Sequence, residues 1–233
     1  MRQKQALPSG TVLARAASGA ALILALALSG CGQVQNLNPL GGIGGTADTA
    51  RYNFESGAQG WNFSVSQATP TNSCVGASWA QGISFAGTGS LRMTVNSMNN
   101  SVSDTAAVSV TSGSNPPLSQ SDLAGRTITG WVYAPNSIAP STSAPSYVDI
   151  FVVDSSGNYA NGPSVNMVQS NWVQVSFSPV ASANGYNISG VGYAQAGFNP
   201  ASVQEVGFKM GASGAAAATF QFTGFVYIDS VNW

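Results

Sequence analysis

The stretch FVYIDSVNW, residues 225–233, decides the fold class of this chain. Successive side chains of a β-strand point to opposite faces of the sheet. If the stretch is a strand, its odd-numbered residues share one face: Phe225, Tyr227, Asp229, Val231 and Trp233. Asp229 is the only carboxylate among them and requires a partner or a cation, because burying an unpaired charge is costly. Glu55, at the start of the folded part, is the most suggestive residue to share that site.

Outward from this strand, short apolar or alternating segments recur between clusters of Gly, Asn, Ser and Pro, and no helical periodicity is found after Arg51. We expect strands at residues 51–54, 61–66, 82–85, 90–95, 106–110, 127–133, 147–154, 172–177, 190–193, 203–210 and 219–233. The stretch DSSGN, residues 154–158, predicts a hairpin turn. About ten strands at this spacing predict an all-β fold, a two-sheet antiparallel β-sandwich or jelly roll that forms a single domain over residues 51–233.

The composition limits the partners of this domain. Charged residues make up only 6% of the chain, and hydroxyl and amide side chains are abundant, which is common in secreted β-rich proteins. Without residues 1–30, which contain Arg2, Lys4 and Arg15, four basic residues remain against eight acidic ones. Nucleic-acid binding needs a basic stripe, so no nucleic-acid partner is expected.

The first thirty residues have the order of a signal peptide: basic residues, then a short apolar core, residues 20–28, then small residues. The apolar core is shorter than the roughly 20 residues that span a bilayer. Its end, LSGC at residues 28–31, resembles the lipobox of bacterial lipoproteins. The resemblance implies that residues 1–30 are removed, that Cys31 is lipidated, and, with Gly32 next, that the exported protein is anchored at the outer membrane or cell surface. A plain secretory leader with a chance cysteine is the alternative.

Residues 31–50 contain two Gly pairs and a Pro without sustained periodicity, so we interpret them as a flexible tether. If Cys31 carries lipid, Cys74 has no partner within the chain and is a buried or loop thiol. A disulfide between the two cysteines requires the lipobox interpretation to be wrong. A catalytic thiol lacks its usual base, because the chain has no His.

Four stretches share their order and spacing with a known family: NFESG at 53–57 followed by Trp61, LAGRTITGWVY at 123–133, NWVQVSF at 171–177, and VQEVGFK at 203–209 leading to YIDSV at 227–231. Together they resemble the β-jelly-roll carbohydrate-binding modules of galactose-binding-like fold that accompany polysaccharide-degrading enzymes. The resemblance covers Arg51 to Trp233. It implies a single β-jelly-roll domain that binds a polysaccharide or cell-surface glycan without cleaving it.

The resemblance also implies a structural calcium ion with Glu55 and Asp229 as ligands. Calcium takes six to eight oxygen ligands, many of them backbone carbonyls that a sequence cannot show. In the alternative interpretation, Glu55 lies in an exposed turn and Asp229 meets a basic residue: Arg51, Arg126 or Lys209.

Sugar rings present apolar C–H faces, so glycan sites combine aromatic platforms with amides at the edges. We interpret four tryptophans as core residues: Trp61, Trp131, Trp172 and Trp233. Trp79 differs, because it lies in a polar, Gly-containing stretch, residues 71–82, that we expect to be a loop. The predicted ligand contacts are Trp79, Tyr159, Tyr193, Asn161 and Gln195.

Two other functions compete with glycan binding. A glycoside hydrolase needs two carboxylates across a cleft. Asp149 and Glu205 are conceivable as a pair, with Asp149 on the same strand phase as Tyr147, Phe151 and Val153, but no motif joins them. The second alternative is a structural or adhesive envelope lipoprotein that binds another protein. The favoured interpretation is a lipid-anchored, monomeric glycan-binding module without enzymatic activity.

Overall fold

The computed structural model describes residues 48–64, 67, 74–99, 104–135, 146–212 and 221–233 of the 233-residue chain. The predicted signal peptide, Cys31 and nearly all of the predicted tether lie outside these residues. All described residues belong to one compact unit, Asn36–Trp233. No helix within the described ranges is long and apolar enough to cross a membrane.

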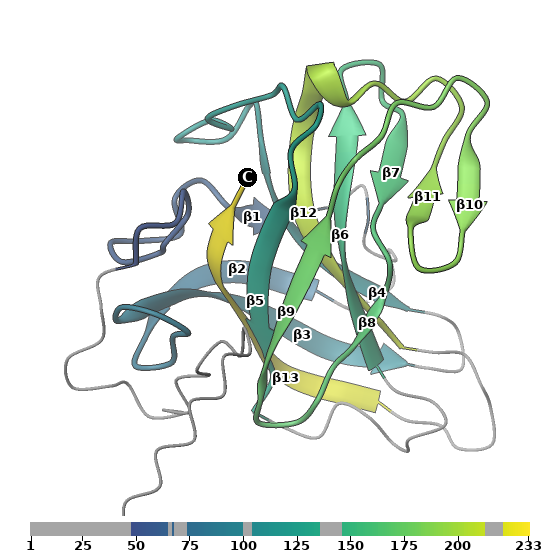
Figure 1. The fold of residues 1–233 in the computed structure, drawn as a ribbon. Helices are drawn as coiled ribbons and strands as arrows, with labels where there is room; N and C mark the ends of the chain where they lie inside the picture. Colours follow the sequence, from purple (N-terminus) through teal and green to yellow (C-terminus); the bar gives the residue numbers. More distant parts are fainter. Residues whose placement is uncertain (1–47, 65–66, 68–73, 100–103, 136–145, 213–220) are drawn as a thin grey trace, which may run out of the picture. The chain divides into compact units, whose positions relative to one another are not determined.

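Two antiparallel sheets make up the fold (Figure 1). The larger sheet has the order β1 (Asn62–Phe63), β4 (Thr105–Thr111), β12 (Val203–Ala212), β6 (Ser146–Asp154), β7 (Tyr159–Asn161), β11 (Gly192–Ala194) and β10 (Tyr186–Ile188), with β8 (Val165–Asn166) also paired to β6. The smaller sheet has the order β2 (Cys74–Gln81), β3 (Gly89–Asn99), β13 (Gln221–Asn232), β5 (Ile128–Tyr133) and β9 (Trp172–Phe177). A 3-10 turn, Pro200–Ser202, precedes β12. The predicted two-sheet antiparallel sandwich is confirmed.

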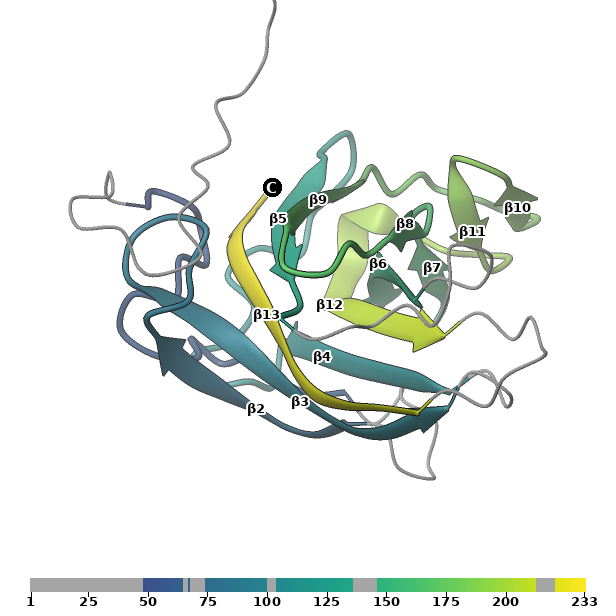
Figure 2. The same cartoon turned by 90° about the horizontal axis from the view of Figure 1, so that it is seen from below.

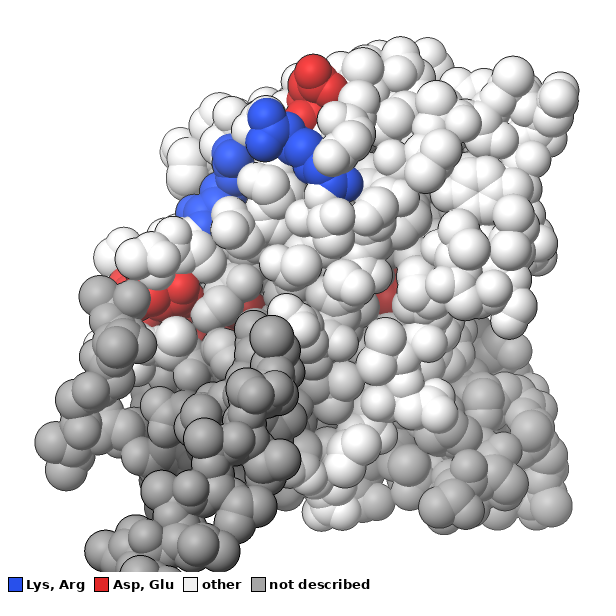
Figure 3. Space-filling view, in the orientation of Figure 1, with Lys and Arg blue, Asp and Glu red and all other residues white. Residues whose placement is uncertain are grey.

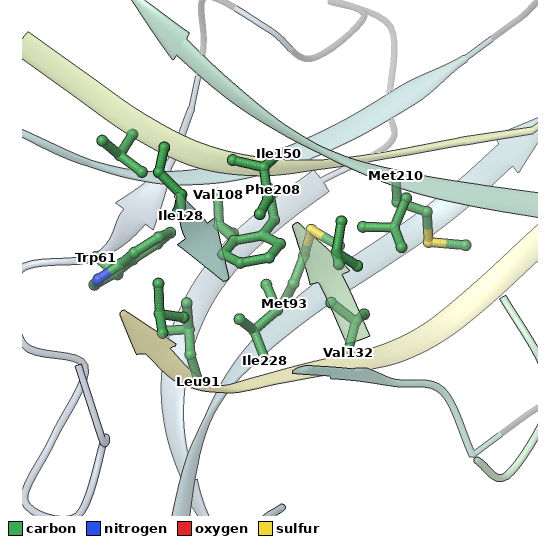
Figure 4. Close-up of a cluster of buried hydrophobic side chains, with 14 of the residues drawn as sticks. Trp61, Leu91, Met93, Val108, Ile128, Val132, Ile150, Phe208, Met210 and Ile228 are labelled. Carbon is green, nitrogen blue, oxygen red and sulfur yellow. The ribbon is translucent and has the colours of Figure 1, made fainter. Parts of the chain in front are cut away.

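The hydrophobic core lies between the sheets. Phe208 of β12 is fully buried at its centre, with Trp61 at one side and Ile228 of β13 opposite (Figure 4). Its ring reaches the backbone of β5, where a Cβ at Gly130 would lie 2.5 Å from Phe208 Cζ. Burying a side chain of this size contributes about 1.5–3 kcal/mol. The absence of a side chain at Gly130 therefore lets the Phe208 ring pack against the facing sheet.

The strand β13 keeps its alternation only as far as Asp229. Val226 and Ile228 are buried in the core, whereas Tyr227 and Asp229 belong to the other face. Ser230 has a φ of 52°, and the pairing with β5 is irregular between Asp229 and Asn232. This irregularity turns Val231 into the core. The prediction that all five odd-numbered positions share one face is therefore wrong beyond Asp229.

The two ends of the domain are joined. Tyr52 and Val231 form an antiparallel bridge with two backbone hydrogen bonds of 3.0 Å. Beside it, the Arg51 guanidinium lies 5.0 Å from the centre of the Trp233 ring and donates to Ser119 Oγ and Gln120 Oε1, both at 2.9 Å. The predicted strand at residues 51–54 is thus reduced to this single bridge.

One strand prediction and one loop prediction are wrong, and one turn prediction is confirmed. Residues 82–85 are not a strand, and the stretch 71–82, expected to be a loop, contains β2. β2 is rich in Ala, Gly and Ser, which have low β-propensity, but its pairing with β3 overrides that preference. The predicted turn after β6 closes through Gly157 N donating to Asp154 O at 2.9 Å, with Gly157 at a φ of 83°.

The surface carries few charges. The face of the molecule seen in Figure 3 is mostly uncharged, with the Lys and Arg side chains gathered in its upper part. The described residues contain a single salt bridge, between Lys209 and Asp149. The few charges on this face agree with the low charged fraction of the composition.

Candidate functional site

The outer face of the larger sheet carries a row of side chains that crosses all seven strands of its main path. Because paired residues of neighbouring strands lie side by side, the strand registers define this larger-sheet row: Asn62, Ser109, Gly207, Phe151, Asn161, Tyr193 and Asn187. With about 4.8 Å between strands, seven strands extend over about 29 Å. The row is therefore a long surface that runs perpendicular to the strands.

Two glycines on β12 let aromatic rings of β6 lie close to the sheet. A Cβ at Gly207 would lie 2.4 Å from two ring carbons of Phe151, and a Cβ at Gly211 would lie 2.3 Å from the Tyr147 hydroxyl. The rings occupy the space that side chains of β12 would otherwise fill. Phe151 is consequently buried although it points away from the core between the sheets.

Three aromatic rings follow one another across this face. Tyr159 stacks on Phe151, with 6.1 Å between ring centroids and 26° between planes, and its other neighbour is Tyr193, also at 6.1 Å. Tyr193 remains 36% exposed. Asn161, two residues after Tyr159, pairs with Tyr193 in the register. The structure thus brings together three of the predicted ligand residues: Tyr159, Asn161 and Tyr193.

Gln195, the fourth predicted ligand residue, lies beside this group and holds its backbone. Its side-chain Oε1 accepts from Tyr159 N at 2.7 Å, and its own backbone N donates to Tyr159 O at 2.8 Å. These bonds fix the position of Tyr159 relative to β11. The structure therefore gives the Gln195 side chain a supporting contact next to the aromatic rings.

A charged pair lies among the same rings. Lys209 Nζ donates to the Tyr159 hydroxyl at 2.6 Å and lies 3.7 Å from Asp149 Oδ1, an ion pair longer than a hydrogen bond. Asp149 is only 2% exposed. Burial raises the pKa of Asp149 to about 6, although Lys209 acts to lower it. Burial also raises the pKa of Tyr159, and the negative charge of Asp149 adds to that increase.

Asp149 and Glu205 do not form an acid pair. Glu205 Oε1 accepts from Ser64 Oγ at 2.8 Å and from Ser109 Oγ at 2.7 Å. Glu205 is paired with Val153, four residues along β6 from Asp149, which corresponds to about 13 Å along the strand. Hydrolytic carboxylate pairs lie about 5–10 Å apart. Each carboxylate is held by its own local partners.

The larger-sheet row has a hollow at each end. One lies between the segment after β7 and the β10–β11 hairpin and is lined by Asn161, Ser164, Asn187 and Tyr193 among others. The other lies beside β1 and β4 and is lined by Gln59, Asn62, Ser109, Thr111 and Asn115 among others. Both hollows combine amides and hydroxyls with an aromatic ring. The row is therefore open at both ends rather than closed into a pocket.

The fifth predicted ligand residue, Trp79, lies elsewhere. It belongs to β2 of the smaller sheet, and the β10–β11 hairpin that carries Tyr193 lies on the far side of the molecule (Figure 2). Its indole Nε1 donates to Phe54 O, and a Cβ at Gly89 would lie 2.7 Å from that nitrogen. The structure thus does not bring Trp79 together with the other predicted ligand residues.

The two predicted calcium ligands contact one segment, loop 82–89, which joins β2 to β3 and includes the first residue of β3, Gly89. Asp229 Oδ2 accepts from Phe85 N at 2.7 Å and from Ala86 N at 3.1 Å. Both oxygens of Glu55 accept from Thr88 N at 2.9 Å. Within the described part of the chain no basic residue pairs with Asp229, so the alternative partners Arg51, Arg126 and Lys209 are wrong for it.

Asp229 is fully buried, and a second carboxylate lies near it. Asp48 Oδ2 accepts from Ser230 Oγ at 2.7 Å, and Asp229 Oδ1 accepts from Ser230 N at 2.7 Å. Burial raises the pKa of Asp229 to about 8, and the charge of Asp48 acts in the same direction. Carboxylates and loop carbonyls fit calcium in ligand type. However, no group of three or more His, Cys, Asp or Glu among the described residues could hold a metal, and the calcium site stays a prediction.

No family model matches the chain, and no curated protein matches it. Solved structures similar to it include a protein described among the carbohydrate-binding modules of the β-sandwich superfamily, with 18% identity, a TM-score of 0.47, and coverage of 81% of this chain and 62% of that one. This chain therefore spans less than two thirds of that protein. The module CBM27-1 of Caldicellulosiruptor saccharolyticus, solved in complex with mannohexaose, has 13% identity and a TM-score of 0.46 over 77% of this chain and 93% of its own.

An exo-β-agarase is also similar, with 9% identity and a TM-score of 0.45 over 78% of this chain and 25% of its own. With TM-scores below 0.5, these similarities carry no argument about this chain. The site therefore rests on its own geometry.

Sequence reasoning missed several residues of the outer face. Strand pairing alone places Ser109 and Asn187 in the larger-sheet row and Lys209 beside it. A signal was present in β12, where Gly207, Lys209 and Gly211 alternate with large apolar residues. Glycines on one phase of a strand indicate that other groups lie close to that face.

Proposed function

We propose that this chain binds a polysaccharide or cell-surface glycan on the outer face of its larger sheet. The observation that carries the proposal is the exposed Tyr193 ring next to Tyr159 and Asn161, on a row that crosses the whole sheet. The buried Phe151 ring supports Tyr159 from the side. Aromatic rings accept the C–H faces of sugars, and amides bind the hydroxyls at the ring edges. Because the row is open at both ends, it suits an internal stretch of a linear glycan.

The binding is proposed to be non-catalytic. Asp149 is buried beside Lys209, and Glu205 is held by two serine hydroxyls. Their separation along the strands exceeds the spacing of hydrolytic pairs. The face therefore offers contacts to a sugar chain without an acid pair to cleave it.

We further propose that the domain is a monomer attached to the bacterial outer membrane or cell surface through lipid on Cys31. The sequence LSGC at residues 28–31, after a basic and then apolar leader, supports this attachment. Residues 31–50 then act as a flexible tether. Radiolabelled fatty acid incorporated by the chain and lost in Cys31→Ser tests the anchor.

Calcium is proposed as a structural ion beside Asp229 and Glu55. The buried Asp229 and the nearby Asp48 place two negative charges close together, which a cation would offset. The ion would supply positive charge where the described residues provide no basic side chain. Its role would be to hold loop 82–89 and the end of β13.

The glycan proposal is tested by electrophoresis of the full chain, in a polyoxyethylene detergent, through gels containing mannan, xylan, β-glucan, agarose, pectin or a cellulose derivative. We expect retardation by at least one of them, lost in Tyr193→Ala and in Asn161→Ala. Val168→Ala removes an exposed side chain outside the row and should leave retardation intact. No retardation of folded protein by any polysaccharide would favour an envelope protein that binds another protein.

A further inference from the structure

The outer face of the smaller sheet carries a second row of side chains. The strand registers define this smaller-sheet row, which crosses all five strands: Ser78, Arg92, Tyr227, Tyr133 and Trp172. The Tyr133 ring lies 5.2 Å from that of Trp172 and 6.3 Å from that of Tyr227. Three neighbouring strands therefore carry adjacent aromatic rings on a face that does not line the core between the sheets. Tyr133 and Tyr227 are buried among them, and Trp172 is half-buried.

A further aromatic group adjoins this row. Phe85, from loop 82–89, stacks on Trp131 with 3.9 Å between centroids and 10° between planes, and its edge faces Trp172 at 6.0 Å. Trp131 and Trp172 thus lie on the outer face, and their interpretation as residues of the core between the sheets is wrong. The outward face of an antiparallel sheet is usually polar, so this concentration of rings needs an explanation.

Arg92 gives the face its charge. Its guanidinium carbon lies 4.8 Å from the centre of the Phe225 ring, which is 39% exposed, and its Nε donates to Ser78 Oγ at 3.2 Å. Among the described residues no carboxylate forms a salt bridge with Arg92. The planar guanidinium has five donors suited to a carboxylate or sulfate group. Its charge is therefore available to an external anion.

The two outer faces differ in charge balance. On the larger sheet, Lys209 is close to Asp149 and bonded to Tyr159. On the smaller sheet, Arg92 lies beside aromatic rings and a serine. A neutral sugar chain matches the first arrangement, whereas a sugar chain with acidic groups complements the second.

We propose that the outer face of the smaller sheet is a second binding site, for an anionic polysaccharide. The Phe225 ring, which is 39% exposed, and the half-buried Trp172 ring receive the sugar rings. Arg92 binds a carboxylate or sulfate group through its terminal nitrogens. None of these residues belongs to the larger-sheet row. The second site is therefore independent of the proposed function. If the second site were disproved, glycan binding at the larger-sheet row would not be affected.

The test measures retardation of the full chain, in a polyoxyethylene detergent, by polygalacturonate, by dextran sulfate and by neutral dextran. We expect at least one polyanion to bind, and the pair identifies whether the anion is a carboxylate or a sulfate. Arg92→Gln should weaken that binding by about tenfold or more, the effect of losing one charge-assisted hydrogen-bonded pair. Tyr193→Ala, on the other sheet, should leave polyanion binding unchanged while it abolishes binding at the larger-sheet row.

Phe225→Ala provides a second variant in case Arg92→Gln does not fold, because its ring is exposed. It should weaken polyanion binding as well, with an unchanged melting temperature. The proposal is overturned if no polyanion binds, if Arg92→Gln and Phe225→Ala bind as tightly as the original chain, or if only Tyr193→Ala loses binding. Self-association that Phe225→Ala abolishes, without polyanion binding, would also overturn it and assign the face to contacts between copies.

Discussion

Lys209 and Asp149 face each other across β12 and β6, with 3.7 Å between Nζ and Oδ1, on a sheet face crowded with aromatic rings. Burial raises the pKa of Asp149 to about 6, so Lys209 does not fully offset the cost of removing this carboxylate from water. The pair therefore leaves the candidate site without net charge, but the buried carboxylate lowers the free energy of unfolding near neutral pH.

The titration of Asp149 should appear in the pH dependence of stability. Because its pKa is higher in the folded chain than the ordinary value of 3.8, stability is greatest below about pH 4 and falls as pH rises through about 6. The loss is on the order of 3 kcal/mol at most. Asp149→Asn should reduce this fall, as measured by urea unfolding between pH 4 and 7, and leave the part that comes from Asp229, whose pKa is raised to about 8.

Lys209, Tyr147 and Tyr159 face Asp149, and burial raises the pKa values of the two tyrosines further above this range, so the tyrosines should not obscure the effect. Asp122→Asn changes an exposed carboxylate and serves as the control. Parallel pH profiles for Asp149→Asn and the original chain would show that Asp149 has an ordinary pKa.

Gly207→Ala should disturb the aromatic stack. A Cβ there would lie 2.4 Å from the Phe151 ring and 2.5 Å from Val108 O, so the ring must lift. We expect a loss of about 1–3 kcal/mol in the free energy of unfolding, with weaker glycan binding through the displaced Tyr159. Gly76→Ala is the matched control, because a Cβ on that strand residue meets nothing within 4 Å. Equal stability of the two variants would show that the stack tolerates displacement.

Calcium should raise the melting temperature of the chain relative to the same sample in EGTA. An ion at a hundred times its Kd stabilises by about 2.7 kcal/mol, which calorimetry resolves readily. Asp229→Asn and Glu55→Gln should abolish the response, whereas Asp122→Asn should keep it. Identical melting in EGTA and in millimolar CaCl₂ would mean that the two carboxylates hold loop 82–89 through N–H groups and the Thr88 hydroxyl, without an ion.

Trp79→Phe should separate packing from ligand contact. The change removes the hydrogen bond from the indole to Phe54 O and should cost about 0.5–1.5 kcal/mol. Glycan binding at the larger-sheet row should not change, because Trp79 belongs to the other sheet. Loss of glycan retardation in a stably folded Trp79→Phe chain would instead support the predicted ligand role of Trp79.

The fold class was predictable because β6 and β13 carry strand signals strong enough to be recognised locally. The larger-sheet row was not, because it depends on register between strands far apart in sequence, such as Phe151 with Gly207. Tyr159, Asn161 and Tyr193 were found because each lies near a turn with little apolar sequence around it. Their proximity to Lys209 required the structure.

The errors also have physical causes. Trp131 was interpreted as a core residue because a strand pattern does not distinguish the inner face of a sheet from an aromatic outer face. The change of face at Val231 depends on the positive φ of Ser230. A serine in the sequence does not predict a positive φ. β2 was missed because its pairing with β3, rather than its composition, makes it a strand.

The bridge between Tyr52 and Val231 has a mechanical consequence. Suppose that the domain is held at its amino-terminal side while a bound ligand pulls on it. The force then acts on this bridge and its two backbone hydrogen bonds. Arg51, one residue earlier, shares the load through Trp233, Ser119 and Gln120. Tension would therefore reach β13 directly. It would load the Tyr52–Val231 bridge and the Arg51 contacts before it deformed either sheet.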